Sequence, residues 1–247
     1  GMAFPETWAP EETHIRPAWF PEGRTFGVGL GYTPGCVVPE GGPERTQAWC
    51  ERLAWVWARD PVLNDLLGHK CITCPDVAYL AAPEFLANRV PEDQRAGTLV
   101  VVNAGAPYAY HNLLAECLLR VDEGEQVTLV SATAAHGEND RRMCERIADA
   151  IDSPLVIADS NVYSWREFLH LVAKAKHVVS CRAHPCIFAD MLGVPYTTFD
   201  LFGEYAGIAA VSGATGEARS EIAILVAHGQ ALLGLQELVA HIKECVA

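Results

Sequence analysis

The sequence has little positive charge. It contains 18 Lys and Arg residues against 31 Asp and Glu residues, which gives a formal net charge of −13, and no basic tail or cluster interrupts this acidic balance. Nucleic acids and anionic membranes attract proteins through basic surfaces, so we expect neither as a partner. An anionic ligand would need a positive site that is focused locally.

The sequence also shows no signal peptide, no apolar run long enough to span a membrane and no internal repeat. Its nine cysteines are scattered along the chain. Disulfides persist mainly in oxidising compartments, where secreted chains are delivered by a leader. We therefore expect a cytoplasmic protein with reduced thiols and no membrane span.

Motifs for metal binding and for hydrolysis are missing. No group of His, Asp and Glu has metal-ligand spacing, and no Gly-x-Ser-x-Gly sequence is present. Cys71 and Cys74 form a Cys-x-x-Cys pair, but no second Cys or His pair and no evident helix start accompanies them. Two half-buried strand thiols explain this pair better than a zinc or redox site. We predict no metal and no cofactor.

What the chain does contain is a regular alternation of strands and helices from residue 98 onward. Short apolar runs predict strands, and amphipathic segments of about ten residues between them predict crossover helices. Ser164 and Glu167 have the spacing of a helix capping box. The fold class is therefore α/β, with a doubly wound, Rossmann-like parallel sheet. The strands are expected at residues 99–103, 126–131, 155–158, 177–180 and 196–199, and the helices at 110–119, 139–151 and 165–175, with a further helix that follows a turn through residues 181–184 and ends at Leu192.

The predicted domain organisation is simple. Residues 1–43 form an irregular arm with a Gly-rich strand, and residues 44–247 form a single Rossmann-like domain. The apolar, helical stretch at 217–246 ends that domain, with breaks expected at Gly229 or Gly234.

The segment at residues 176–199 carries the main functional signal. It predicts a strand, a loop with Arg182 and His184, a helix and a second strand. Ligands of parallel sheets bind beyond the carboxyl ends of strands, where a guanidinium can hold an anion and an imidazole can transfer a proton. The structural alternative is that Arg182 pairs with a carboxylate, such as that of Asp190 or Asp200, and that His184 caps the helix.

Other predicted strands also end in polar or small residues. Arg59 and Asp60 follow one strand, Asn103 and Gly105 follow another, and Ser131 ends a third. They could line the same cleft as Arg182. The alternatives are an Arg–Asp bridge or a helix cap at Asp60, and simple turns at the other two strand ends.

Taken in order, these residues resemble the polysaccharide pyruvyl transferase family, specifically its C-terminal half. The family pattern has a Gly-rich strand, an Arg-Asp strand end, a Pro-Asp-x-Ala element, a Ser-x-Arg-x-His segment and a Gly-Val-Pro turn. The matching segments are Gly27-Val28-Gly29-Leu30-Gly31, Arg59-Asp60, Pro75-Asp76-Val77-Ala78, Ser180-Cys181-Arg182-Ala183-His184 and Gly193-Val194-Pro195. The match covers roughly residues 26–207.

The resemblance implies a fold similar to the C-terminal domain of GT-B glycosyltransferases. Enzymes of this family transfer a pyruvyl group from phosphoenolpyruvate to a sugar hydroxyl in cell-surface polysaccharide synthesis. Arg182 would then hold the phosphate or carboxylate of the donor, and His184 would be a general acid or a phosphate ligand. The substrate-binding residues implied are Arg59, Asn103, Gly105, Ser131, Ser180, Arg182 and His184.

Three functions remain open at this point. The first is a pyruvyl transferase-like enzyme with an anionic donor and a saccharide acceptor, in which a homo-oligomer or a partner chain supplies the missing N-terminal half of the cleft. The second is a non-catalytic module that binds an anion. The third is the donor domain of a glycosyltransferase that uses a nucleotide sugar.

Overall fold

The structure is a computed structural model of the 247-residue chain, and it describes residues 3–4, 26–32, 52–67, 71–104, 109–132, 140–151, 155–159, 164–199 and 209–246. Contacts divide the chain into two compact units. Unit 1 consists of Gly1–Ala81, Leu201–Ala214 and Leu225–Ala247, and unit 2 of Ala82–Asp200 and Thr215–Ile224. The predicted division into an arm at 1–43 and one domain at 44–247 stays a prediction, because grouping by contacts describes packing and does not measure which segments fold together.

Unit 2 is built on a parallel five-stranded sheet. Its strands are β5 (Thr98–Val101), β6 (Val127–Ser131), β7 (Val156–Asp159), β8 (His177–Ser180) and β9 (Tyr196–Thr198). Their order in the sheet is β7-β6-β5-β8-β9. The chain therefore winds outward in one direction from β5 to β7, and then returns to the other side of β5. This order is that of a doubly wound sheet, as the sequence predicts.

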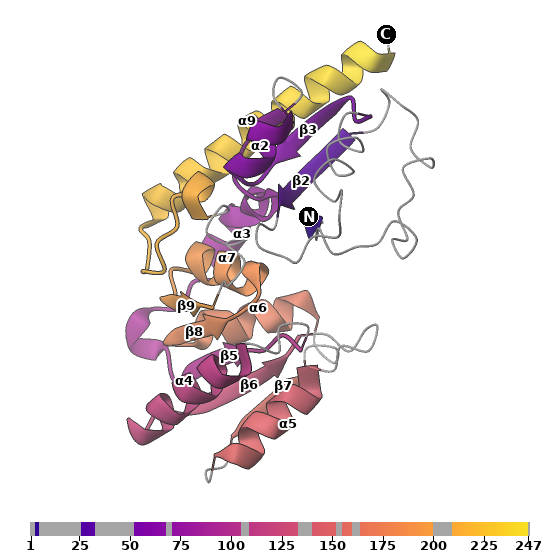
Figure 1. Cartoon of the computed structure of the whole chain (residues 1–247). Helices are drawn as coiled ribbons and strands as arrows, with labels where there is room; N and C mark the ends of the chain where they lie inside the picture. Colours follow the sequence, from indigo (N-terminus) through magenta and orange to yellow (C-terminus); the bar gives the residue numbers. More distant parts are fainter. Residues whose placement is uncertain are drawn as a thin grey trace, which may run out of the picture. The chain divides into compact units, whose positions relative to one another are not determined.

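Helices cover both faces of this sheet (Figure 1). One face carries α4 (Tyr110–Asp122) and α5 (Asp140–Ala150), which pack on each other and on β5 and β6. The other carries α6 (Trp165–Lys174) and α7 (Ala183–Leu192), which also pack on each other. Each helix lies between two parallel strands, as right-handed crossovers require.

The core under α4 and α5 is formed by alternate strand residues and by the inward faces of these two helices. All its members are less than a tenth exposed. They are Val100, Val102, Ala109, Leu113, Cys117, Val127, Leu129, Met143, Cys144, Ile147, Ile151 and Val179. The packing of this core determines where the neighbouring strands end along the sheet. It thereby positions the residues that follow those strands.

The ends of α6 and α7 follow the sequence signals. Ser164 and Glu167 form the predicted capping box at the start of α6. Gly193 ends α7 with φ +66°, a left-handed conformation that glycine adopts without strain. The last carbonyls of α7 accept hydrogen bonds from two arginines, Arg89 to Met191 O at 3.2 Å and Arg95 to Gly193 O at 2.7 Å. These bonds hold α7 at its C-terminal end.

Residues 82–94 contain α3 (Ala82–Ala87) and the 3₁₀ turn η4 (Glu92–Gln94). Helix α3 packs on α7, and Phe85 lies 5.2 Å from Phe188, centroid to centroid. The helix is short, and its aromatic contact is tertiary, so the local pattern carries little signal for it.

Unit 1 has a second parallel sheet, ordered β1-β2-β3-β4. Its strands are β1 (Ala3–Phe4), β2 (Phe26–Tyr32), β3 (Trp55–Ala58) and β4 (Cys71–Thr73). The predicted Gly-rich strand is β2. Helix α2 (Pro61–Leu67) lies between β3 and β4, and the 3₁₀ helix η3 (Val77–Ala81) follows β4. Most of the predicted arm lies outside the described residues.

The C-terminal helix α9 (Glu221–Val246) runs without a break through Gly229 and Gly234, so the predicted interruption at either glycine is wrong. Over Glu221–Cys245 it is long and apolar enough to cross a membrane, with a mean hydropathy of 1.5, and 28% of its most apolar window is buried. Core helices of soluble proteins also meet this criterion. The expectation of no membrane span therefore stays a prediction.

The two glycines of α9 have different surroundings within unit 1. A Cβ at Gly234 would lie 2.7 Å from Cys74 Sγ and 3.1 Å from Cys74 Cβ, whereas a Cβ at Gly229 would have no atom of the described residues within 4 Å. Gly234 therefore allows α9 to approach the segment after β4. Gly229 has no such role.

We predict opposite effects of alanine at these two sites. Gly234→Ala forces Cys74 and the helix apart and should lower the free energy of unfolding by roughly 1–3 kcal/mol. Gly229→Ala removes only backbone freedom and should raise it by about 0.5–1 kcal/mol. Urea unfolding followed by circular dichroism measures both, and equal effects of the two variants would contradict the proposed packing of α9.

Candidate functional site

The carboxyl ends of β5 and β8 form the point where the winding of the unit 2 sheet reverses. Val101 and Ser180 are paired in register at the last ladder position of these strands. The chain then leaves the sheet as Val102-Asn103 on one strand and Cys181-Arg182 on its neighbour. Parallel sheets bind ligands at this kind of reversal, because the loops on its two sides diverge.

The Arg182 side chain, which follows β8, reaches across this reversal point to the end of β5. Its Nε donates to Val102 O at 3.1 Å, and its Nη2 donates to both carboxylate oxygens of Asp140, at 3.2 and 2.9 Å. A quarter of the Arg182 side chain remains exposed, while that of Asp140 is fully buried. Arg182 thus forms an ion pair at the carboxyl edge of the sheet and still reaches the surface there.

Asp140 is the first residue of α5, and the sequence analysis does not identify it. Its Oδ1 accepts the backbone N–H of Ala104 at 2.7 Å, and its Oδ2 accepts that of Ala132 at 3.1 Å. Ala104 follows β5 and Ala132 follows β6. One carboxylate therefore joins the ends of β5, β6 and β8. Its sequence signal is only an acidic residue at the start of a predicted helix, which is common.

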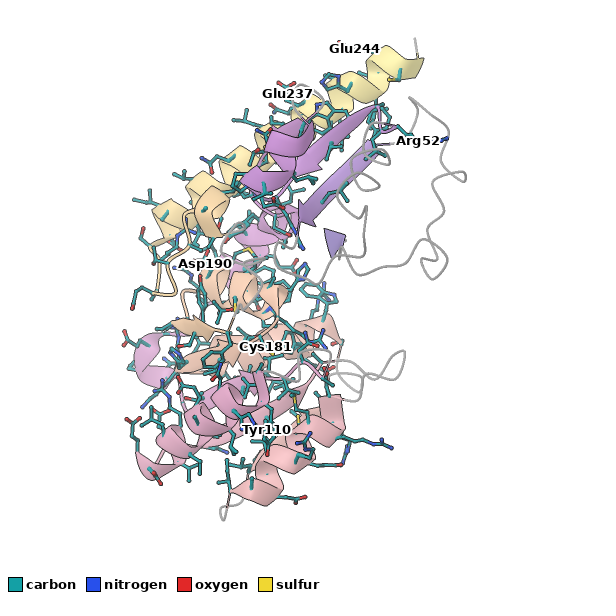
Figure 2. All side chains as sticks on the ribbon, in the orientation of Figure 1. Arg52, Tyr110, Cys181, Asp190, Glu237 and Glu244 are labelled. Atoms are coloured by element: carbon teal, nitrogen blue, oxygen red, sulfur yellow. The ribbon has the colours of Figure 1, made fainter. Side chains whose placement is uncertain are left out.

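The structural alternative is right that Arg182 pairs with a carboxylate, but Asp190 is not that carboxylate. Asp190 lies in α7, fully buried, and pairs with Arg219 at 2.9 Å (Asp190 is labelled in Figure 2). Asp200 lies outside the described residues. The ion pair of Arg182 is real, but its partner is Asp140.

His184 lies in the first turn of α7, and it is half-buried. The residue at the N-cap position is Arg182, in an extended conformation with φ −116° and ψ 141°, so the alternative that His184 caps the helix is wrong. The His184 ring lies 6.2 Å from the ring of Phe188, centroid to centroid. The imidazole is therefore positioned by α7 itself, one turn from an aromatic neighbour.

Ser180 and Cys181 shape the turn that leads to Arg182. The Ser180 hydroxyl accepts the backbone N–H of Arg182 at 2.9 Å and donates to Arg182 O at 3.1 Å. Burial raises the pKa of the Cys181 thiol to about 11, although Arg182 next to it lowers that pKa (Cys181 is labelled in Figure 2). The Cys181 thiol is consequently protonated at neutral pH, and the protonated form is a poor nucleophile.

The remaining predicted residues of unit 2 follow neighbouring strands. Asn103 is half-buried beyond the end of β5. Ser131 ends β6 fully buried, and its hydroxyl has no hydrogen-bond partner among the described residues. Gly105 lies outside the described residues. Their predicted part in substrate binding stays a prediction.

Arg59 in unit 1 has a different environment. It is 1% exposed, and its Nη1 lies 2.8 Å from Oδ2 of Asp76, which is equally buried. Asp60 accepts the N–H of Leu63 at 2.8 Å and so caps α2, as the structural alternative states. The Arg-Asp and Pro-Asp segments thus meet in an ion pair between the ends of β3 and β4. The anion contact predicted for Arg59 stays a prediction.

The cysteines and carboxylates of the described residues form no cluster that could hold a metal ion. Cys71 in β4 is half-buried, and burial raises the pKa of its thiol to about 12. Cys74 is buried just beyond the strand, and its pKa is raised for the same reason. Both are free thiols; Cys71 is half-buried in the strand as the interpretation states, whereas Cys74 lies beyond the strand and is buried, so that part of the interpretation is wrong.

The comparison with protein families agrees with the order of these segments. A family model described as polysaccharide pyruvyl transferase matches residues 7–200. The chain belongs to the polysaccharide pyruvyl transferase family. No curated protein matches the chain by sequence.

Solved structures of other proteins have a fold similar to that of this chain. UDP-GlcNAc 2-epimerase from Methanocaldococcus jannaschii, solved with UDP-GlcNAc and UDP, matches 80% of the chain at 14% identity with a TM-score of 0.51. The enzyme from Neisseria meningitidis, bound to UDP-GlcNAc, matches 86% at 13% identity, also with a TM-score of 0.51. These likenesses concern the fold, which is GT-B-like. The chain spans 60% and 64% of the length of those two proteins.

The buried pair in unit 1 of this pyruvyl transferase family member makes a testable contribution to stability. Asp76→Ala leaves Arg59 charged and buried without its carboxylate, and we expect a loss of about 3–5 kcal/mol in the free energy of unfolding. The control is Glu145→Ala, which breaks the Arg141–Glu145 pair, whose side chains are 57% and 48% exposed.

We expect that control to change stability by less than about 0.5 kcal/mol, because solvent screens exposed pairs. Urea unfolding of both variants provides the measurement. A loss in Asp76→Ala no larger than in Glu145→Ala would contradict a structural role for the Arg-Asp and Pro-Asp segments.

Proposed function

We propose that this protein acts as a polysaccharide pyruvyl transferase, moving a pyruvyl group from phosphoenolpyruvate to hydroxyls of a saccharide in cell-surface polysaccharide synthesis. Family membership supports the reaction class. The observation that carries the proposal is the position of Arg182 and His184 at the reversal point between β5 and β8, beside the start of α7. A guanidinium, an imidazole and a helix N-terminus all favour an anion there.

The residue types suit the chemistry. Forming the ketal adds a proton to C3 of the donor, joins two sugar oxygens to C2 and breaks the bond from C2 to the phosphate oxygen. Of the two protons that the sugar hydroxyls lose, one is matched by the new C3–H bond and the other by the proton on the released phosphate. In this scheme His184 is the general acid that protonates C3, and Arg182 stabilises the negative charge on the departing phosphate.

The start of α7 adds a further reason to expect an anion. Its N-cap residue Arg182 makes no side-chain capping hydrogen bond to the described residues of the first turn. Backbone N–H groups of a helix start carry a partial positive charge. A donor phosphate next to Arg182 would satisfy them. Asn103, Ser131 and Ser180 complete the proposed donor site in unit 2, and Gly105 and Arg59 stay proposed substrate-binding residues.

The acceptor side of the site belongs to the same proposal. The chain spans less than two thirds of the GT-B-like proteins it matches. We propose that a second copy or a partner chain contributes a wall of the cleft that holds the saccharide. A donor domain for a nucleotide sugar is the second candidate, because the protein from Methanocaldococcus jannaschii was solved with UDP-GlcNAc and UDP.

Calorimetric titration with phosphoenolpyruvate tests the donor site directly. We expect wild type to bind, and Arg182→Ala to bind about 10- to 100-fold more weakly, since a charged hydrogen bond contributes roughly 1.5–3 kcal/mol. His184→Ala should keep most of the affinity but, with the complete acceptor side, lose about 10²- to 10⁴-fold in kcat.

Arg120→Ala is the matched control for this titration. The Arg120 side chain is 21% exposed, close to the 25% of Arg182, but it lies at the end of α4, where it contacts Glu116 and Glu123. Its loss should leave phosphoenolpyruvate binding unchanged. A folded wild type that does not bind phosphoenolpyruvate would overturn the proposal, and selective binding of UDP would favour the nucleotide-sugar candidate.

A further inference from the structure

Asp140 is a fully buried carboxylate at the carboxyl edge of the unit 2 sheet. Burying a carboxylate is unfavourable unless hydrogen bonds and an opposite charge compensate for the lost water. Here both kinds of compensation come from the ends of strands. Two peptide N–H groups and the Arg182 guanidinium donate to its two oxygens.

The hydrogen-bond partners of Asp140 differ from those of an ordinary helix cap. A cap accepts N–H groups of its own helix, two or three residues further on. Asp140 accepts N–H groups from Ala104, 36 residues earlier, and from Ala132, 8 residues earlier. Its contact with Arg182 spans 42 residues. The carboxylate is therefore oriented by β5 and β6 and, in turn, orients a side chain that follows β8.

The contact with Asp140 restricts the motion of the Arg182 side chain. An arginine side chain loses roughly 2 kcal/mol of conformational entropy when it is fixed. In this protein Nε is held by Val102 O and Nη2 by Asp140, so the guanidinium is fixed in the absence of a ligand. An anion that binds to Arg182 then does not have to order it.

We infer that Asp140 is a positioning residue for anion binding: it holds Arg182 in place at the reversal point between β5 and β8, so that the guanidinium is preorganised for the donor anion. The inference rests on the proposed function for the identity of that anion. Asp140 touches neither donor nor acceptor in this role. It acts through Arg182.

The direction in which Asp140→Asn changes the affinity for phosphoenolpyruvate distinguishes a positioning role from a simple effect of charge. Asp140→Asn removes a negative charge next to the site, which by Coulomb attraction alone would tighten the binding of a multiply charged anion. Loss of positioning has the opposite result, because the ligand must then order Arg182. We expect about two- to tenfold weaker binding of phosphoenolpyruvate, the range set by immobilising one long side chain.

A double-mutant cycle tests that Asp140 acts through Arg182. Calorimetric titration with phosphoenolpyruvate is made on wild type, Asp140→Asn, Arg182→Ala and the double variant. If the inference holds, Asp140→Asn weakens binding in the wild-type background and has no further effect once Arg182 is absent. Unchanged or tighter binding in Asp140→Asn, or an equal loss in both backgrounds, overturns it.

The matched control is Asp190→Asn. Asp190 is likewise fully buried and pairs with an arginine at 2.9 Å, but its partner is Arg219, in the same unit and away from the start of α7. Both substitutions should lower the thermal midpoint, since each leaves an arginine without its carboxylate. Only Asp140→Asn should change the Kd for phosphoenolpyruvate. A comparable change in Asp190→Asn would show a general effect of instability and would overturn the inference.

A second measurement needs no ligand. Phenylglyoxal modifies accessible guanidinium groups, and peptide mass spectrometry gives its rate at each arginine. We expect a several-fold faster reaction of Arg182 in Asp140→Asn than in wild type, with Arg120 as the internal reference. The same rate in both proteins overturns the inference. If wild type does not bind phosphoenolpyruvate, the proposed function fails, while these rates still decide the role of Asp140.

Asp140→Ser covers the case in which the amide variant does not fold. Serine is a favoured residue at a helix start and keeps one acceptor for the N–H groups of Ala104 and Ala132. It cannot form the charged pair with Arg182. The expected results are the same as for Asp140→Asn: weaker phosphoenolpyruvate binding and faster modification of Arg182.

Discussion

The pairing of β5 with β8 is the constraint on which the rest of unit 2 depends. These strands are distant in sequence, and their register places Val101 beside Ser180. Everything that follows the two strands is thereby brought together: Asn103 and Ala104 on one side, Arg182 and the start of α7 on the other. The buried apolar faces of α4 and α5 fix this register, because a slip of one residue would turn every core side chain outward.

Several arginines of this acidic protein are tied to buried carboxylates. In the part of the chain that the structure describes, these pairs are Arg59–Asp76, Arg182–Asp140 and Arg219–Asp190. Each joins segments that lie 17 or more residues apart. Such pairs add less stability than apolar packing would, but they disfavour any arrangement that separates the partners. They specify which segments of the chain meet.

Much of unit 2 could be predicted from the sequence, because its signals are local. The strand β8 agrees with the predicted range, Gly193 ends α7 as its position after the apolar stretch indicates, and Ser164 caps α6. The partner of Arg182 could not be predicted in this way. Choosing Asp140 over Asp190 requires knowledge of which helix starts beside which strand end, and that depends on the strand order. The uninterrupted course of α9 could not be predicted in this way either. Its close approach to Cys74 at Gly234 is a tertiary contact between segments that are distant in sequence.

Two arginines show why the residue type alone does not identify a ligand site. Arg59 and Arg182 both follow parallel strands, both belong to segments typical of the family, and both form an ion pair with an aspartate at less than 3 Å. They differ in exposure, 1% against 25%. An anion can reach Arg59 only by displacing protein from around it and competing with Asp76 in a medium of low polarity, where that pair is strongest. Arg182 keeps part of its guanidinium side chain at the surface while Asp140 holds the rest. Exposure at the carboxyl edge, in addition to charge, therefore makes Arg182 the stronger candidate for the anion ligand.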